Sequence, residues 1–278
     1  MYGCGTLGTI AAAAPLAWAS ATFGWRASMM ACGMSSLLLA VLLVLLVRQP
    51  AGPGPAAKDP RRHPMREAIK RVLASRHFWM LCIVYSVLMT AYLGFYGMWF
   101  GPYLVQSCGM DKVGAGAILS AGAAAGIAGV PLAAVVSDAI RSRKAVIIAM
   151  TAVQALCIAV LAAFPGRLPV PALMALAAAF AFCDGAAGLC FTSCKELFPL
   201  SILGAATGCL NTLPPLLGAA SQKAYGMLLG WMQGAGAGTQ GAYGGATLLY
   251  LGILLCACVS SLFIRETHPS AYQAGDLQ

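Results

Sequence analysis

The chain has 278 residues, of which 60% are apolar and only 9% are charged. Soluble domains average about 45–50% apolar and about 25% charged residues, so this chain lacks the polar residues to cover a water-facing surface. Its net charge of +9 could suggest a nucleic-acid partner, but the basic residues are confined to a few loops between apolar runs. The composition therefore excludes a nucleic-acid-binding domain and predicts a polytopic protein of the lipid bilayer.

The first 47 residues contain two apolar runs, each long enough to cross a membrane. The runs carry no charged residue, and a short Gly-Trp-Arg turn separates Gly3–Phe23 from Ala27–Val47. No basic residue precedes the first run, which argues against a secretory signal peptide. We therefore predict two transmembrane helices over residues 1–47.

Residues 48–77 form a polar linker that the sequence divides into two parts. Residues 49–64 contain five prolines and two glycines, a composition that cannot hold a helix and predicts a flexible tether. Residues 65–76 have the apolar spacing of an amphipathic helix, which favours a helix lying in the cytoplasmic membrane interface. Its predicted apolar face consists of Met65, Ile69, Val72 and Leu73. A simple solvated tether is the alternative.

Six further apolar runs predict a six-helix bundle over residues 78–264, followed by a tail at 265–278. Continuous runs rich in Ala, Leu and Gly favour α-helices over the alternating strands of a membrane β-barrel. The fold class that we predict is an all-α polytopic membrane protein with eight transmembrane helices. The six later runs are Phe78–Leu104, Lys112–Val136, Ala145–Phe164, Val170–Cys194, Ser201–Leu229 and Tyr243–Ile264.

The basic residues are distributed unevenly between the two sides of these predicted helices. Thirteen of the 17 Lys and Arg residues fall on one side, in the linker, at 141–144, and at Lys195 and Arg265. Loops rich in Lys and Arg remain in the cytoplasm. The distribution therefore predicts a protein of the inner (plasma) membrane with both termini in the cytoplasm.

Two polar residues lie deep within predicted membrane helices. Asp184 is near the middle of its run, where an ionised carboxylate costs about 2.5–3.5 kcal/mol. Asn211 lies at a similar depth on the next run, which crosses in the opposite direction, so the two side chains could meet. Two roles remain open, namely a structural hydrogen bond between helices and a cavity group that binds substrate or carries a proton.

The third run carries an aromatic pattern with helical spacing. Tyr85, Tyr92, Tyr96, Trp99 and Tyr103 are separated by 7, 4, 3 and 4 residues, which predicts that they share one helical face. The last two lie where interfacial anchors are common. The three deeper tyrosines need hydrogen-bond partners, which favours a polar cavity wall, and packing within the bundle is the alternative.

The small and sulfur-containing residues predict packing rather than chemistry. Gly122 and Gly126 are four residues apart, a spacing that lets two membrane helices approach closely. The eleven cysteines lie almost entirely within apolar runs, and the three histidines lie in loops or at helix ends. Neither a zinc ligand set nor a catalytic Cys/His pair is indicated. We therefore predict no metal, no cofactor and no enzymatic activity.

A charged loop follows the fourth run. It begins at Asp138 and contains Arg141, Arg143 and Lys144. Cations just beyond a helix C-terminus are favourable, and Asp138 can pair with one of them. Such a pair can latch two helix ends together, and a solvated loop without a latch is the alternative.

This charged loop, Asp138–Lys144, resembles the signature of the major facilitator superfamily, in which an Asp and several basic residues occupy a short cytoplasmic turn. The likeness departs from the usual pattern at Ala134, where a glycine is usual, and at Ala139, where an Arg is common. Further likeness lies in Phe23–Arg26, Trp99–Leu104 and Lys195–Pro199.

Aligned on these motifs, the chain resembles helices five to twelve of a twelve-helix family: two helices of the first bundle, the central loop and a complete second bundle. The resemblance implies a secondary active transporter that moves a small polar solute by alternating access. It implies a gating role for the charged loop, a path lined by the three deeper tyrosines and Asn211, and a substrate or coupling-proton role for Asp184.

Because the first four helices have no counterpart here, we expect an N-terminally truncated copy that needs the missing helices or a partner chain. The alternative is a non-transporting membrane subunit or remnant that assembles with a partner.

Overall fold

The computed structural model describes residue 19, residues 22–46 and residues 64–268, and it assigns only helices and their connections there. Seven of these helical segments are long and apolar enough to cross a membrane, which confirms the predicted all-α membrane fold. Most of the first predicted helix, Gly3–Phe23, lies outside the described residues, as do 47–63 and 269–278. The chain divides into two compact units, residues 1–62 and residues 63–278.

The first unit contributes helix α2, Trp25–Leu46, which corresponds to the predicted run Ala27–Val47. Gly24 precedes the helix with φ of +82°, a left-handed conformation that glycine adopts without steric cost. The guanidinium of Arg26 lies 5.2 Å from the ring centroid of Trp25. The predicted Gly-Trp-Arg turn is therefore shorter than expected, because the helix already includes Trp25 and Arg26.

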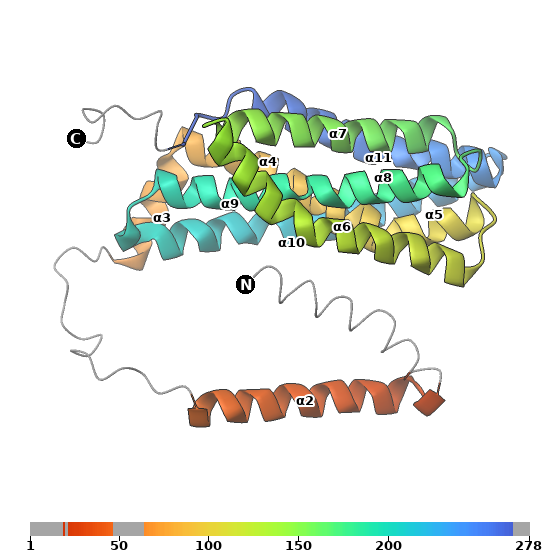
Figure 1. The fold of residues 1–278 in the computed structure, drawn as a ribbon, viewed down its shortest axis with the longest axis horizontal. Helices are drawn as coiled ribbons and strands as arrows, with labels where there is room; N and C mark the ends of the chain where they lie inside the picture. Colours follow the sequence, from red (N-terminus) through yellow and green to blue (C-terminus); the bar gives the residue numbers. More distant parts are fainter. Residues whose placement is uncertain (1–18, 20–21, 47–63, 269–278) are drawn as a thin grey trace. The chain divides into compact units, whose positions relative to one another are not determined.

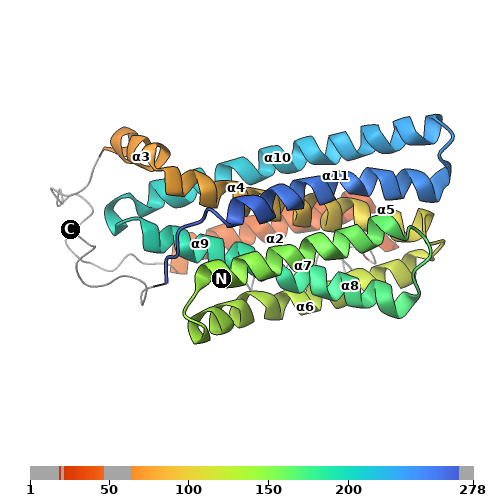
Figure 2. The ribbon, with the colours of Figure 1, turned by 90° about the horizontal axis from the view of Figure 1, so that it is seen from above.

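The second unit is a bundle whose long helices run side by side along one axis (Figures 1 and 2). The charged loop, helix α3 (Met65–Ala74) and the end of α9 (Gly185–Leu197) lie at one end of this bundle. The connections between α7 and α8 and between α10 and α11 lie at the other end. The basic loops thus gather at one end of the second unit.

Helix α3 lies in the second half of the linker, where the sequence predicted a helix, and one side of it is buried in protein. Ala68 and Val72 are buried, whereas Met65 is 68% exposed and Leu73 is 42% exposed. The buried side packs against α10 (Leu200–Gly234). A protein neighbour therefore covers one side of α3, and the predicted placement of this helix in the membrane interface stays a prediction.

The third predicted run forms one continuous segment with an irregular centre. Helix α4 (Arg76–Thr90) leads into the π-helix η1 (Ala91–Trp99), which leads into α5 (Phe100–Gln106). Phe95 of η1 is 1% exposed and lies against the rings of Phe180, Tyr225 and Tyr250. This segment supplies the centre of the core.

Glycines set the distance between α6 (Lys112–Ala139) and the segment formed by α8 (Val170–Cys183) and α9. A Cβ on Gly129 would collide with the backbone of Phe182, and one on Gly185 would lie 2.5 Å from the carbonyl oxygen of Gly129. Gly126 similarly faces Ala181. The predicted close approach of helices is therefore observed, and it continues beyond Gly126.

The two remaining long helices complete the bundle. Helix α7 (Arg143–Ala163) begins after Ser142, whose hydroxyl accepts from the N–H of Ala145. Helix α11 (Gly238–Ser261) packs against both α7 and α10. Helix α10 contains Pro214 and Pro215.

Candidate functional site

A one-residue interruption at Asp184 separates α8 from α9. Fourteen residues of α8 precede Asp184 and thirteen residues of α9 follow it, so it is the central residue of a membrane-length segment. Its N–H donates to the carbonyl of Ala181 instead of continuing the regular ladder to Phe180. The carbonyl oxygen of Phe180 accepts from the side-chain amide of Gln154 on α7, at 3.1 Å. The interruption is tolerated in lipid because a neighbouring helix satisfies the backbone.

The Asp184 side chain is buried within the second unit, with 4% of the residue exposed. Its carboxyl group lies close enough to the phenol groups of Tyr85 and Tyr92 to interact electrostatically with both. Tyr92 belongs to η1, and the rings of Phe95 and Tyr96 in the same π-helix pack against Phe180, four residues before Asp184. The π-helix therefore lies beside the interrupted helix pair. Irregular backbone at membrane depth is found where it is buried in protein or lines a water-filled cavity.

Asn211 joins this group through Tyr85. The Tyr85 hydroxyl donates to the Asn211 Oδ1 at 2.8 Å, and the Asn211 side-chain nitrogen donates to the carbonyl of Thr207. Asn211 itself is exposed on α10. Tyr85 is thus the residue that connects Asn211 to the surroundings of Asp184, and a direct meeting of Asp184 and Asn211 stays a prediction. We call Tyr85, Tyr92, Asp184 and Asn211 the central polar cluster.

The five aromatic residues of the third run do not share one face. Tyr96 donates to the carbonyl of Leu119 on α6, Trp99 to that of Gln222 on α10, and Tyr103 to that of Leu161 on α7. The predicted stripe assumed α-helical spacing, and a π-helix holds more residues per turn. Within η1, Tyr92 and Tyr96 stack at 5.4 Å, and Tyr96 stacks on Phe180. Tyr96 therefore lies in an aromatic stack beside the cluster.

The charged loop is held by one buried arginine. Arg143 pairs with Asp138 at 2.7 Å and with Glu196, at the end of α9, at 3.2 Å. It also donates to the hydroxyl of Ser137 at 3.0 Å. Only 10% of its side chain is exposed, compared with 61% for Asp138. The structure thus contains a latch between two helix ends, with Glu196 as a member that the sequence analysis did not include.

The other two bases of the charged loop have different surroundings. Arg141 is exposed and adopts φ of +54°, the left-handed conformation of a tight turn. Lys144 donates through Nζ to the carbonyl of Leu262, just beyond α11, at 2.6 Å. Among the three bases of the charged loop, Arg143 is therefore the one that pairs directly with Asp138, while Lys144 ties the loop to the end of α11.

The segment after α11 completes the latch, and the sequence analysis treated it only as a tail. Glu266 accepts hydrogen bonds from the Ser142 hydroxyl and from the N–H groups of Arg143 and Lys144. Thr267 donates to Ser193 on α9 at 2.9 Å. The sequence did contain a signal for Glu196 and Glu266. Each directly follows a basic residue, Lys195 or Arg265, at the end of an apolar run.

The pKa of Glu266 lies below its ordinary value. Burial acts to raise this pKa, but the hydrogen bonds from Ser142, from the backbone of His268 and from the first N–H groups of α7 together outweigh it. A carboxylate at the N-terminus of a helix is further favoured by the helix dipole. The ionised form of Glu266 therefore stabilises the folded state.

Replacing Glu266 with Gln is expected to lower the free energy of unfolding at pH 7 by about 1–2 kcal/mol. Because the folded-state pKa is depressed, the contribution of Glu266 is present above its unfolded pKa and is lost as the pH falls through the folded pKa. Unfolding midpoints measured from pH 7 down to pH 3 should converge for the two proteins. A difference that stays constant with pH would contradict this role.

Among the residues that the structure describes, no group of three or more His, Cys, Asp or Glu side chains is placed to hold a metal ion. The described cysteines are all free thiols. The central polar cluster therefore consists of two phenols, one carboxyl group and one amide.

A comparison with protein-family models gives one informative match. The model described as Major Facilitator Superfamily matches residues 1–221, which includes the charged loop and the whole central polar cluster. A comparison with curated proteins gives no match.

Proposed function

Because the chain belongs to the Major Facilitator Superfamily and is thus a multi-pass membrane protein of a transporter family, we propose that it is a secondary active transporter of a small polar solute. The observation that carries this proposal is the central polar cluster. It combines a carboxyl group at the centre of its segment with two phenols and an amide that lie within neighbouring membrane-length helices. A polar or ionisable group at this depth marks a substrate or ion pathway by default.

Asp184 is the proposed proton-coupling residue. Its carboxyl group sits at the interruption between two half-helices, the arrangement that many transporters use at the midplane. Asn211 and Tyr85 supply acceptors and donors for the solute, and Asn211 is the exposed member of the cluster. Exchange of a proton at Asp184 would alter the electrostatic environment of the Tyr85 and Tyr92 phenols, and with it the affinity for the solute.

The charged loop has a mechanical role in this proposal. Arg143, Glu196 and Glu266 connect the ends of α6, α7, α9 and α11 within the second unit. Alternating access by rocking requires each bundle to move as a rigid body. We therefore propose that the loop takes part in gating by keeping this end of the second unit rigid. By the positive-inside rule this end faces the cytoplasm of a plasma (inner) membrane.

The test of the coupling role is proton movement in proteoliposomes. A trapped pH dye reports acidification when sugars, amino acids or carboxylic acids are added one class at a time. Wild-type protein is expected to acidify the lumen with one class, and Asp184→Asn is expected to slow this by about a hundredfold or more, which is the lower range for loss of a proton-transfer group.

Asp111→Asn is the matched control for this experiment. Asp111 caps α6 through a hydrogen bond from Gly114, and asparagine caps equally well. Unchanged coupling in Asp184→Asn would remove the carboxyl group from the mechanism. Equal losses in both variants would indicate damage to folding rather than to coupling.

A second candidate function is a membrane subunit that works only with a partner. It is favoured by the low burial of α6 and α10 within the second unit. Each buries 22% of its most apolar stretch, compared with 67% for the segment Arg76–Ser107. Absence of flux for every solute class, together with flux on co-expression of a partner bundle, would favour this function.

A further inference from the structure

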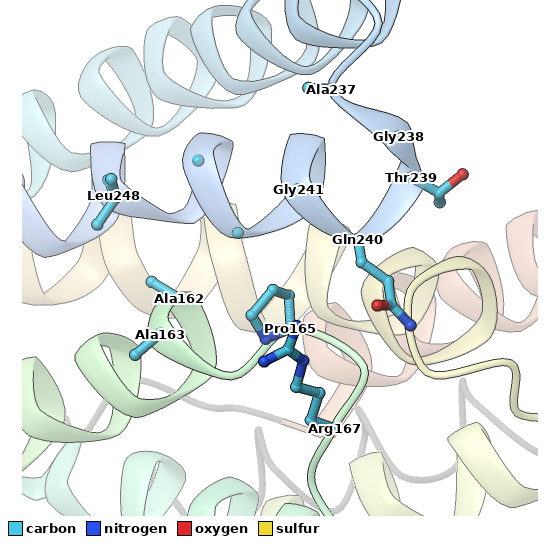
Figure 3. A pocket seen from close by; sticks show the side chains of 12 residues that line it. Ala162, Ala163, Pro165, Arg167, Ala237, Gly238, Thr239, Gln240, Gly241 and Leu248 are labelled. Atoms are coloured by element: carbon cyan, nitrogen blue, oxygen red, sulfur yellow. The ribbon is translucent and has the colours of Figure 1, made fainter.

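A cavity of about 680 Å³ lies at the end of the second unit opposite the charged loop (Figure 3). Its walls come from the end of α7, the connection after it and the first turns of α11. Ala162, Ala163, Gly241, Gly244 and Leu248 form the apolar part of the lining. This lining is separate from the central polar cluster, because the two sets share no residue.

One side chain of the cavity lining carries a charge. Arg167 is its only charged lining residue, and the lining contains no acidic side chain, as all twelve lining residues are described. Figure 3 shows the Arg167 guanidinium beside Pro165, among the lining side chains. Gln240, the other long polar side chain, is committed in part to the carbonyl of Ser107 at 3.4 Å. The cavity is thus complementary to one negative charge.

The position of the cavity in a membrane suggests the source of that charge. Helix α7 ends at Ala163 and α11 begins at Gly238, so the Arg167 end lies where membrane helices leave the hydrocarbon. Leu248 lies ten residues further into α11, or about 15 Å deeper. Leu248 is 55% exposed, so the apolar wall is open at acyl-chain depth. A ligand that fits both parts has an anionic head and an apolar tail.

We propose that this cavity binds an acidic phospholipid, with the phosphate at Arg167 and the acyl chains along Ala162 and Leu248. Guanidinium groups pair with phosphate oxygens through two parallel N–H bonds, which favours Arg for this contact. The small residues of α11 leave room for the glycerol backbone of the lipid. This site does not depend on the proposed transport activity.

The experiment uses the full chain, stripped of lipid in detergent and titrated with phosphatidylglycerol or phosphatidylcholine of equal chain length. Retained lipid is counted by native mass spectrometry. Wild-type protein is expected to prefer phosphatidylglycerol by about tenfold, and Arg167→Gln to abolish that preference. Gly241→Leu, which places a side chain in the cavity, is expected to reduce retention of both lipids.

Lys112→Gln is the matched control, because Lys112 begins α6 at the same end of the bundle but does not line the cavity. It should retain phosphatidylglycerol as the wild-type protein does. An equal loss in Arg167→Gln and Lys112→Gln would overturn the site in favour of general surface attraction. Unchanged retention in Arg167→Gln, or displacement of the lipid by inorganic phosphate at equal concentration, would overturn it as well.

Discussion

Replacement of Arg143 by glutamine is expected to lower the free energy of unfolding by about 2–4 kcal/mol. The guanidinium pairs with Asp138 and Glu196 and donates to Ser137, and only 10% of the side chain is exposed. Its loss leaves the carboxylate of Glu196, which is 21% exposed, without its compensating charge. Because Asp138 is largely exposed, its share of the effect is small.

The measurement is thermal unfolding in detergent with a dye that reacts with newly exposed thiols, since Cys190 and Cys194 are buried. Arg143→Lys should recover only part of the lost stability. Lysine restores the positive charge, but its single ammonium group cannot donate to both carboxylates as the planar guanidinium does. Arg141→Asn is the control. Asn accepts the left-handed backbone at this exposed position, so the unfolding midpoint should stay close to that of the wild-type protein. A midpoint for Arg143→Gln equal to that of the control would refute the latch.

Replacement of Gly129 by leucine should have a still larger effect, about 3 kcal/mol or more, and should reduce the yield of folded protein. A Cβ at this position would collide with the backbone of Phe182, and backbone atoms of a packed helix cannot move aside as a flexible side chain can. The carbonyl of Gly129 also lies against Gly185, so α6 and the segment α8–α9 would have to separate where α9 begins. Loss of their close contact removes most of what holds membrane helices together.

Gly116→Leu provides the comparison on the same helix, because a Cβ on Gly116 meets no atom within 4 Å. Its effect should be near zero or slightly stabilising, since leucine favours the helix more than glycine does. The readout is the fraction of monodisperse protein in size-exclusion chromatography, followed by the unfolding midpoint. Similar values for the two leucine variants would show that the contact between α6 and α8–α9 tolerates expansion.

The helices were predictable from the sequence because hydrocarbon allows few alternatives for the backbone. Continuous apolar runs located α6, α7 and α10 within a few residues, and the described part of the chain contains no other class of element. The charged loop could also be found, since Asp138 and its bases stand out in an apolar chain. The irregular segments of the helices could not be predicted from the sequence. Both η1 and the interruption at Asp184 occur in stretches whose composition suits a regular α-helix.

Hydrogen bonds between residues that are distant in the sequence could not be predicted either. Tyr85 and Asn211 are 126 positions apart, and Arg143 and Glu266 are 123 positions apart, so only the fold reveals these pairs. Depth along a helix, estimated at about 1.5 Å per residue, predicts one level for Asp184 and Asn211. It could not identify Tyr85 as the residue that hydrogen-bonds to Asn211. That assignment requires the rotation of each helix about its own axis.

The hydrogen bond from Gln154 to Phe180 has a consequence for how the interrupted segment can bend. It fastens α8, the half that precedes Asp184, to α7, and it makes no contact with the half that follows. A bend at Asp184 would displace α9, whose far end carries Glu196, and it is therefore opposed by the pair between Glu196 and Arg143. Because such coupling is reciprocal, a change at the buried carboxyl group and a change at the arginine pair would affect one another through α9.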